Sequence, residues 1–130
     1  MKFTKVCVML KKRYTKNNSP EHDIQVKIAK YIDALGLLWT ASAGGARMGI
    51  RTAVKMKASG YRKGCPDIMV FEPRGKYCGL FIELKTLTGT ATKEQKAFIL
   101  ALEDRGYRAS ICKGFDATKR EIDDYLKGNC

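Results

Sequence analysis

The chain has 130 residues, a length that suits one domain with at most a short appendage. Hydrophobic residues make up 45% of it, which is enough for a packed core and excludes a chain that is disordered throughout. The 25 Lys and Arg residues outnumber the 13 Asp and Glu residues and give a net charge of +12. We therefore expect a polyanionic partner, nucleic acid before an anionic membrane.

Several protein classes are excluded by the apolar runs and the cysteines. No apolar run approaches the roughly 18 residues that a membrane span needs. The apolar stretch Val6–Leu10 is too short for the core of a signal peptide. The five cysteines form no Cys-x-x-Cys pair, so neither a disulfide framework nor a structural zinc site is indicated, and we expect a reducing cytoplasm.

The first part of the chain combines basic charge with one strong helix signal. Residues 1–18 contain no acid, and we expect them to form a basic strand (Phe3–Leu10) and arm ahead of a folded domain over residues 19–130. Ser19 as N-cap and Pro20 at the first helical position predict a helix that ends at Gly36. Leu37–Ala41 follows as a short strand.

The middle of the chain predicts a loop, a short helix and a hairpin. Ser42–Gly49 is rich in glycine and is predicted as a loop, and Ile50–Ala58 as a short helix. Asp67–Phe71 and Tyr77–Lys85 have the composition of strands, and the turn residues Glu72–Lys76 join them as a hairpin.

The last third predicts a helix, a strand and a second helix. Thr92 and Gln95 have the spacing of a capping box at the start of a helix over Thr92–Arg105. Tyr107–Cys112 is predicted as a strand, and Asp116 as the cap of a final helix. This order of elements predicts an α/β domain in which a mixed central sheet is flanked by helices.

Charged residues with chemical potential meet at one end of the predicted hairpin. Side chains alternate along a strand, so Glu83 and Lys85 project from the face opposite to their apolar neighbours. Because the two strands are antiparallel, Asp67 at the start of the first lies near Glu83 and Lys85 at the end of the second. Taken alone, Glu-x-Lys on a strand is usually an exposed ion pair, and Pro-Asp is usually a turn. Their occurrence together in a basic chain favours a functional site.

Two carboxylates this close repel each other unless a cation lies between them. Hard oxygen ligands suit Mg²⁺, with Mn²⁺ as the alternative ion. Lys85 beside such an ion can orient or deprotonate a water, or neutralise charge that develops on a phosphate. The pattern therefore predicts metal-assisted hydrolysis of a phosphodiester.

The motif Gly64-Cys65-Pro66-Asp67, followed by Glu83-Leu84-Lys85 and then Gln95, resembles the signature of the PD-(D/E)XK nuclease superfamily. The residues around it are similar to the VRR-NUC (virus-type replication-repair nuclease) branch, with Glu21 opening an early helix and Lys57–Tyr61 leading to the motif. The resemblance spans Glu21 to Leu126. It implies a restriction-endonuclease-like core.

Matched to the motif, Asp67 and Glu83 are implied as metal ligands, assisted by the backbone carbonyl of Leu84. Lys85 is implied as the catalytic lysine. The resemblance also implies that Glu21 is a helix-borne acid near the metal.

Two of these assignments have structural alternatives. The helix dipole alone favours an acid such as Glu21 in a first turn, although Glu21 also continues the apolar stripe of Ile28 and Ile32. Gln95 is implied to lie near the scissile phosphate, but a capping box explains it equally well. His22, the only histidine, is expected to be a solvated first-turn residue.

A second stretch without acids, residues 34–66, is basic and contains a glycine-rich loop. This loop lacks the Gly-Lys-Ser/Thr of a nucleotide-triphosphate site, so we expect it to contact DNA phosphates instead. The alternative for this loop is mobility without function. The expected DNA-binding residues are Arg47, Arg51, Lys55, Lys57, Arg62 and Lys63.

Taken together, the sequence predicts a Mg²⁺-dependent endodeoxyribonuclease that acts as a homodimer. The resemblance suggests selectivity for branched DNA, like that of a Holliday-junction resolvase, in phage or viral replication and repair in the host cytoplasm. A nuclease for flaps or nicked duplex is the alternative enzyme. A non-catalytic basic DNA-binding module, with the charged residues as a structural ion cluster, is the alternative from another class.

Overall fold

A mixed sheet of four strands organises the protein in a computed structural model that describes residues 20–42 and 49–128. Its strands are β1 (Trp39–Ala41), β2 (Ile68–Val70), β3 (Leu80–Lys85) and β4 (Arg108–Lys113), and they lie in this order across the sheet. The pairs β1–β2 and β2–β3 are antiparallel, whereas β3 and β4 are parallel. The predicted α/β class with a mixed sheet is confirmed.

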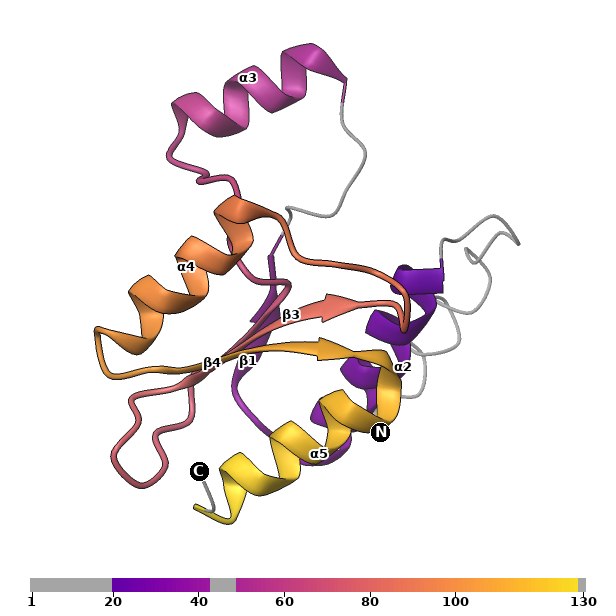
Figure 1. The fold of residues 1–130 in the computed structure, drawn as a ribbon, viewed down its shortest axis with the longest axis vertical. Coiled ribbons are helices and arrows are strands. Elements are labelled where there is room, and N and C mark those ends of the chain that lie inside the picture. Colours follow the sequence, from indigo (N-terminus) through magenta and orange to yellow (C-terminus); the bar gives the residue numbers. More distant parts are fainter. Residues whose placement is uncertain (1–19, 43–48, 129–130) are drawn as a thin grey trace, which may run out of the picture.

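Helices cover both faces of this sheet (Figure 1). α2 (Pro20–Ala34) and α5 (Gly114–Leu126) lie on one face, α4 (Lys93–Glu103) lies on the other, and α3 (Ile50–Ala58) stands off the sheet. The connection β3–α4–β4 is a crossover unit, which is what two parallel neighbouring strands require.

The period-two pattern of β3 divides the interior into two hydrophobic clusters. Leu80, Ile82 and Leu84 are fully buried and pack with residues of α2 and α5, among them Ile28 and Tyr125. On the opposite face, α4 packs against Phe81 of β3 and Tyr107, which precedes β4, and forms the second cluster. This cluster also contains Phe98, Ile99 and Leu102 of α4. The face of β3 that carries Glu83 and Lys85 is therefore the face covered by α4.

Local signals mark several element ends correctly. α2 begins at Pro20, Gly36 follows it with φ of 69°, and α3 has the predicted bounds. Thr92 caps α4 in a capping box with Gln95. Asp116, in contrast, does not cap the last helix: α5 begins at Gly114 directly after β4, and its N-cap Lys113 makes no side-chain capping bond. The prediction failed because no loop separates β4 from α5.

The hairpin is shorter and wider than predicted. β2 has three residues, and β3 begins at Leu80 rather than at Tyr77. The backbone N–H of Cys78 donates to the carbonyl of Gly106 instead of to β2, which draws this part of the chain toward the end of α4. Tyr125 donates its hydroxyl hydrogen to the carbonyl of Glu72 at 2.5 Å and so holds the turn against α5.

Parts of the sequence predictions lie outside the described residues. These are the strand and arm within residues 1–18, the N-cap Ser19 and the loop residue Arg47. In the part that is described, no helix has the length and apolar character needed to cross a membrane.

The loop that precedes β2 packs closely on the first turn of α4. Gly64 has φ of 91°, a left-handed conformation that favours glycine, and a Cβ atom there would lie 2.6 Å from the carbonyl oxygen of Glu94. This contact favours glycine at this position, three residues ahead of Asp67. It links the loop that leads to Asp67 with the helix that carries Gln95.

We expect Gly64→Ala to lower the free energy of unfolding by about 1–3 kcal/mol more than Gly60→Ala, because only the first forces a methyl group onto backbone atoms. Gly60 is the matched control, since its φ of 111° is also left-handed but a Cβ atom added there would have nothing within 4 Å. Urea unfolding of both variants measures the difference. Equal losses would contradict the close contact.

Candidate active site

Charge is buried at one place in the described part of the chain. Asp67, Glu83 and Lys85 are the buried charged residues there, with 7%, 2% and 9% of their surface exposed. Ionised groups rarely become buried unless they are paired or hold a ligand, because desolvation disfavours the charged form. The three residues identified from the sequence are thus also the ones that the fold removes from water.

The sheet register brings the two carboxylates together. Ile68 of β2 pairs with Ile82 of β3, so Asp67 and Glu83 occupy the next position along the antiparallel ladder. Asp67 Oδ2 accepts a hydrogen bond of 2.8 Å from the backbone N–H of Leu84. Lys85 Nζ lies 3.1 Å from Glu83 Oε1. We call Asp67 and Glu83 the acid pair.

Gln95 performs two functions at the start of α4. Its side-chain oxygen accepts from the backbone N–H of Thr92, which completes the capping box. Its side-chain nitrogen donates to Glu83 Oε1 at 2.5 Å. The capping role and contact with the site, which were alternatives in the sequence, therefore occur together.

Glu21 acts on the acid pair through its charge, from the first turn of α2. α2 begins beside the end of β3 (Figure 1), and the negative charge of Glu21 contributes to raising the pKa of both Asp67 and Glu83. Ile28 and Ile32 on the same helix are fully buried, as the predicted stripe requires. His22 is exposed, as expected.

Burial and mutual repulsion dominate the electrostatics of the acid pair. Burial, followed by the charge of Asp67, raises the pKa of Glu83 from 4.5 to about 7. Burial also raises the pKa of Asp67, although the hydrogen bond from Leu84 opposes the shift. The fold thus holds these carboxyl groups where their ionised form is disfavoured in the absence of a compensating cation.

The acid pair fits a divalent cation with few protein ligands. Glu83 Oε2 is buried and has no hydrogen-bond partner among the described residues. Residues 20–42 and 49–128 contain no group of three or more His, Cys, Asp or Glu side chains arranged to hold a metal ion. A small, hard cation such as Mg²⁺ suits this donor set, because it commonly takes one or two carboxylates and completes its shell with water and phosphate.

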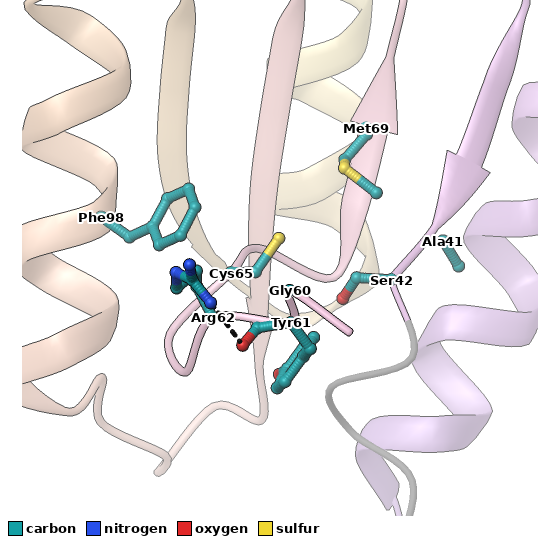
Figure 2. A pocket seen from close by; sticks show the side chains of 8 residues that line it. All are labelled: Ala41, Ser42, Gly60, Tyr61, Arg62, Cys65, Met69 and Phe98. Atoms are coloured by element: carbon teal, nitrogen blue, oxygen red, sulfur yellow. Dashed lines mark hydrogen bonds between the residues drawn. The ribbon is translucent and has the colours of Figure 1, made fainter. Parts of the chain in front are cut away.

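A pocket of about 390 Å³ opens near the acid pair. Figure 2 shows the side chains that line it. Sequence reasoning missed it, because its residues come from β1, the loop before β2, β2 itself and α4. We call it the side pocket; its lining residues are Ala41, Ser42, Gly60, Tyr61, Arg62, Cys65, Met69 and Phe98. The charges of Glu83 and Asp67 add to burial in raising the pKa of Cys65, which indicates how close the pocket lies to them.

The expected DNA-binding residues that the structure describes lie on α3 and on the loop that leads to Asp67. Arg51, Lys55 and Lys57 are exposed on α3, which has no buried residue. Arg62 and Lys63 are exposed on the loop that leads to Asp67, where Lys63 lies 3.6 Å from Glu94.

Comparison with known proteins identifies similar domains. The model of the VRR-NUC domain family matches residues 18–116. A solved structure described as a VRR_NUC domain protein is 28% identical, with a TM-score of 0.71 over 85% of this chain and 91% of that one. A second, described as a VRR_NUC domain, shares the fold at 21% identity and a TM-score of 0.58, over 83% of this chain and 99% of the other. No curated protein matches the chain.

Without a divalent cation, we expect the free energy of unfolding to fall as the pH rises from about 4.5 to about 7. Because the pKa of Glu83 is raised to about 7, the folded protein keeps a proton that the unfolded chain releases in this window. Glu83→Gln should flatten the profile, whereas Glu103→Gln on the exposed end of α4 should not. Urea unfolding in EDTA across this range measures it, and a stability that rises with pH would contradict the assignment.

Proposed function

The chain belongs to the VRR-NUC family of nuclease domains, and from this premise we propose that it is a metal-dependent endonuclease that hydrolyses phosphodiester bonds in DNA. The observation that carries the proposal is the buried acid pair, with one carboxylate oxygen unpartnered among the described residues and Lys85 in contact. The strongly basic composition supports a polyanionic substrate.

Asp67 and Glu83 would hold a divalent cation, Mg²⁺ or alternatively Mn²⁺, with help from the Leu84 carbonyl. The resemblance implies that Glu21 lies near this cation, and in this structure Glu21 influences the acid pair through its charge. Such a cation supplies charge neutralisation at the phosphate and lowers the pKa of a bound water. Because the pKa of Glu83 is raised, binding would displace a proton from the acid pair near neutral pH.

The remaining residues position these groups and stabilise charge. Lys85, which touches Glu83, can orient the attacking water or neutralise the charge that develops on the phosphate. Gln95 holds Glu83 through its hydrogen bond. The family resemblance implies that Gln95 also lies near the scissile phosphate. Water adds to phosphorus, the bond from phosphorus to the 3′ oxygen breaks, and the product carries a 5′-phosphate, as the family resemblance suggests.

Phosphate contacts outside the acid pair would hold the DNA. Arg62 and Lys63 adjoin the site, and α3 extends basic side chains further out. We assign the same role to Arg47 from the sequence alone. Such contacts position a duplex without reading its bases.

We expect Asp67→Asn, Glu83→Gln and Lys85→Ala each to lower the cleavage rate by at least about 10²-fold, because each removes a metal ligand or a charge that stabilises the transition state. DNA binding should persist in all three. The measurement is cleavage of labelled duplex, flap and four-way-junction DNA with and without Mg²⁺. Turnover retained in two of the three variants would contradict the site, and activity that needs no metal would favour a different mechanism. If the wild type binds DNA but does not cleave it, the alternative function, a non-catalytic basic DNA-binding module, would be favoured.

Glu21→Gln should reduce the cleavage rate strongly, whereas Asp23→Asn should leave it near the wild-type value. Both acids lie in the first turn of α2 and interact alike with the helix dipole, but only Glu21 influences the acid pair. Single-turnover cleavage rates and melting temperatures of the two variants are compared. If both variants lose stability equally and neither loses rate, Glu21 acts only through the helix.

We further propose that the enzyme is a homodimer that selects branched DNA in phage or viral replication and repair, in the host cytoplasm. A four-way junction has two-fold symmetry, and a two-fold dimer would present one site to each of two symmetric strands. Exposed Ile50 and Val54 on α3 offer apolar material for an interface. Cys65, Cys78 and Cys112 are free thiols, which supports a reducing compartment.

On four-way junctions the dimer should make paired nicks and bind more tightly than on linear duplex. Light scattering, free and on junction DNA, gives the mass, and product analysis on a plasmid-borne cruciform gives the pairing of nicks. A monomer at micromolar concentration in both states would favour the alternative, a nuclease that nicks flaps or nicked duplex once per encounter.

A further inference from the structure

The side pocket is not used by the hydrolysis just described, yet it adjoins the acid pair on the same face of the sheet. Asp67 directly precedes β2 and Met69 lies two residues later, on β2, so alternation places both on the α4 face while Ile68 and Val70 enter the main core. On α4, Phe98 lies one turn after Gln95, on the same side of the helix. The chain around Asp67 and the helix that carries Gln95 thus continue into the pocket.

The wall of the side pocket is tied directly to the site. The backbone N–H of Ser42 donates to the carbonyl of Asp67 at 2.9 Å, which joins the end of β1 to the acid pair. Two residues along a strand cover about 6.8 Å, which is the scale of the separation between Asp67 and Met69. A group bound in the pocket and a phosphate at the acid pair can therefore belong to one nucleotide or to adjacent ones.

The chemistry of the lining suits a flat, neutral, heteroaromatic group. Figure 2 shows Phe98 entering from α4 on one side and Ser42 on the other, with Cys65 between them and Met69 above Ser42 on β2. An aromatic ring, a thioether and a thiol would be poor partners for a charged phosphate, but they offer faces on which a base can stack.

Polar groups at the pocket could contact the edge of such a base. Ser42 Oγ is buried and has no hydrogen-bond partner among the described residues. The guanidinium group of Arg62 makes a long hydrogen bond of 3.5 Å to the carbonyl of Tyr61 and remains exposed. An apolar cavity with a few polar groups is the usual form of a site for a small ring system, and about 390 Å³ falls in the usual range of roughly 300–1,000 Å³.

We propose that the side pocket receives one unstacked nucleobase of the DNA strand that is cut, next to the scissile phosphate. This inference rests on the proposed nuclease function and names its substrate class: strands in which a base beside the cut is unpaired or easily unpaired. A base that is already free at a branch, flap or nick avoids the cost of unpairing, which gives selectivity without reading sequence.

The test uses a forked DNA in which one nucleotide at a time is replaced by an abasic site. Positions are counted from the branch point, and we call this series the abasic walk. Binding is measured by fluorescence anisotropy in EDTA, so that no cleavage occurs. At one position the missing base should weaken binding by the wild type about 5- to 150-fold, the range for one stacked base. Tyr61→Ala/Phe98→Ala should bind intact DNA more weakly and lose its sensitivity at that position.

Two control variants distinguish loss of base binding in the pocket from misfolding and from the loss of an aromatic ring elsewhere. Phe71→Ala removes a half-exposed ring that does not line the pocket, and it should retain the wild-type pattern. Phe98→Leu keeps apolar volume without a ring and should show a partial loss. Melting temperatures monitor folding, and the wild-type walk is informative even if a variant does not fold.

Two results would contradict the inference that the pocket binds a base. One is a wild type with no position at which a missing base weakens binding, and the other is a double variant that keeps the same sensitive position. Cleavage of the intact fork by the wild type with Mg²⁺ is scored separately. A protein that cleaves but has no sensitive position keeps the proposed function and loses only this inference. A protein that has the sensitive position but does not cleave keeps the pocket and loses the nuclease function.

Discussion

Two carboxylates buried next to each other, on facing positions of β2 and β3, are the constraint on which the other features of the site depend. Their ionised forms are disfavoured by burial and by each other, and the pKa of Glu83 is raised to about 7 in consequence. Glu121 is a useful contrast: burial acts on it too, yet hydrogen bonds from Arg108 and Ser110 outweigh burial and lower its pKa. At the acid pair, the hydrogen bond from Leu84 and the contact with Lys85 do not outweigh burial and mutual repulsion, and Glu83 Oε2 has no hydrogen-bond partner among the described residues.

The surrounding fold supplies what holds this unfavourable arrangement in place. One hydrophobic cluster secures β3 against α2 and α5, and the other secures it against α4. The same elements deliver the polar side chains: Glu21 from the start of α2, and Gln95 from the start of α4. Natural proteins commonly depart from favourable packing and pairing at functional sites, where the cost is offset elsewhere in the fold.

Prediction from the sequence succeeded where the deciding interactions are local. The alternation along β3 follows from strand geometry, and Pro20, Gly36 and the capping box at Thr92 define helix ends through their own backbone chemistry. It failed where a distant contact decides. Cys78 pairs with Gly106, which delays the start of β3, and α5 follows β4 without a loop, so that Asp116 lies inside the helix.

The sequence by itself determined the class of the fold, the family and the identity of the acids and the lysine at the hairpin. Alternation and antiparallel pairing place Asp67, Glu83 and Lys85 at one end of two strands whatever surrounds them. Only the tertiary structure decided that Gln95 both caps its helix and holds Glu83, that the charge of Glu21 acts on the acid pair, and that a pocket opens near it. The physical reason is that each of these depends on how α2, α4 and the loop before β2 pack on the sheet, and a periodic pattern records which face is buried but not what it is buried against.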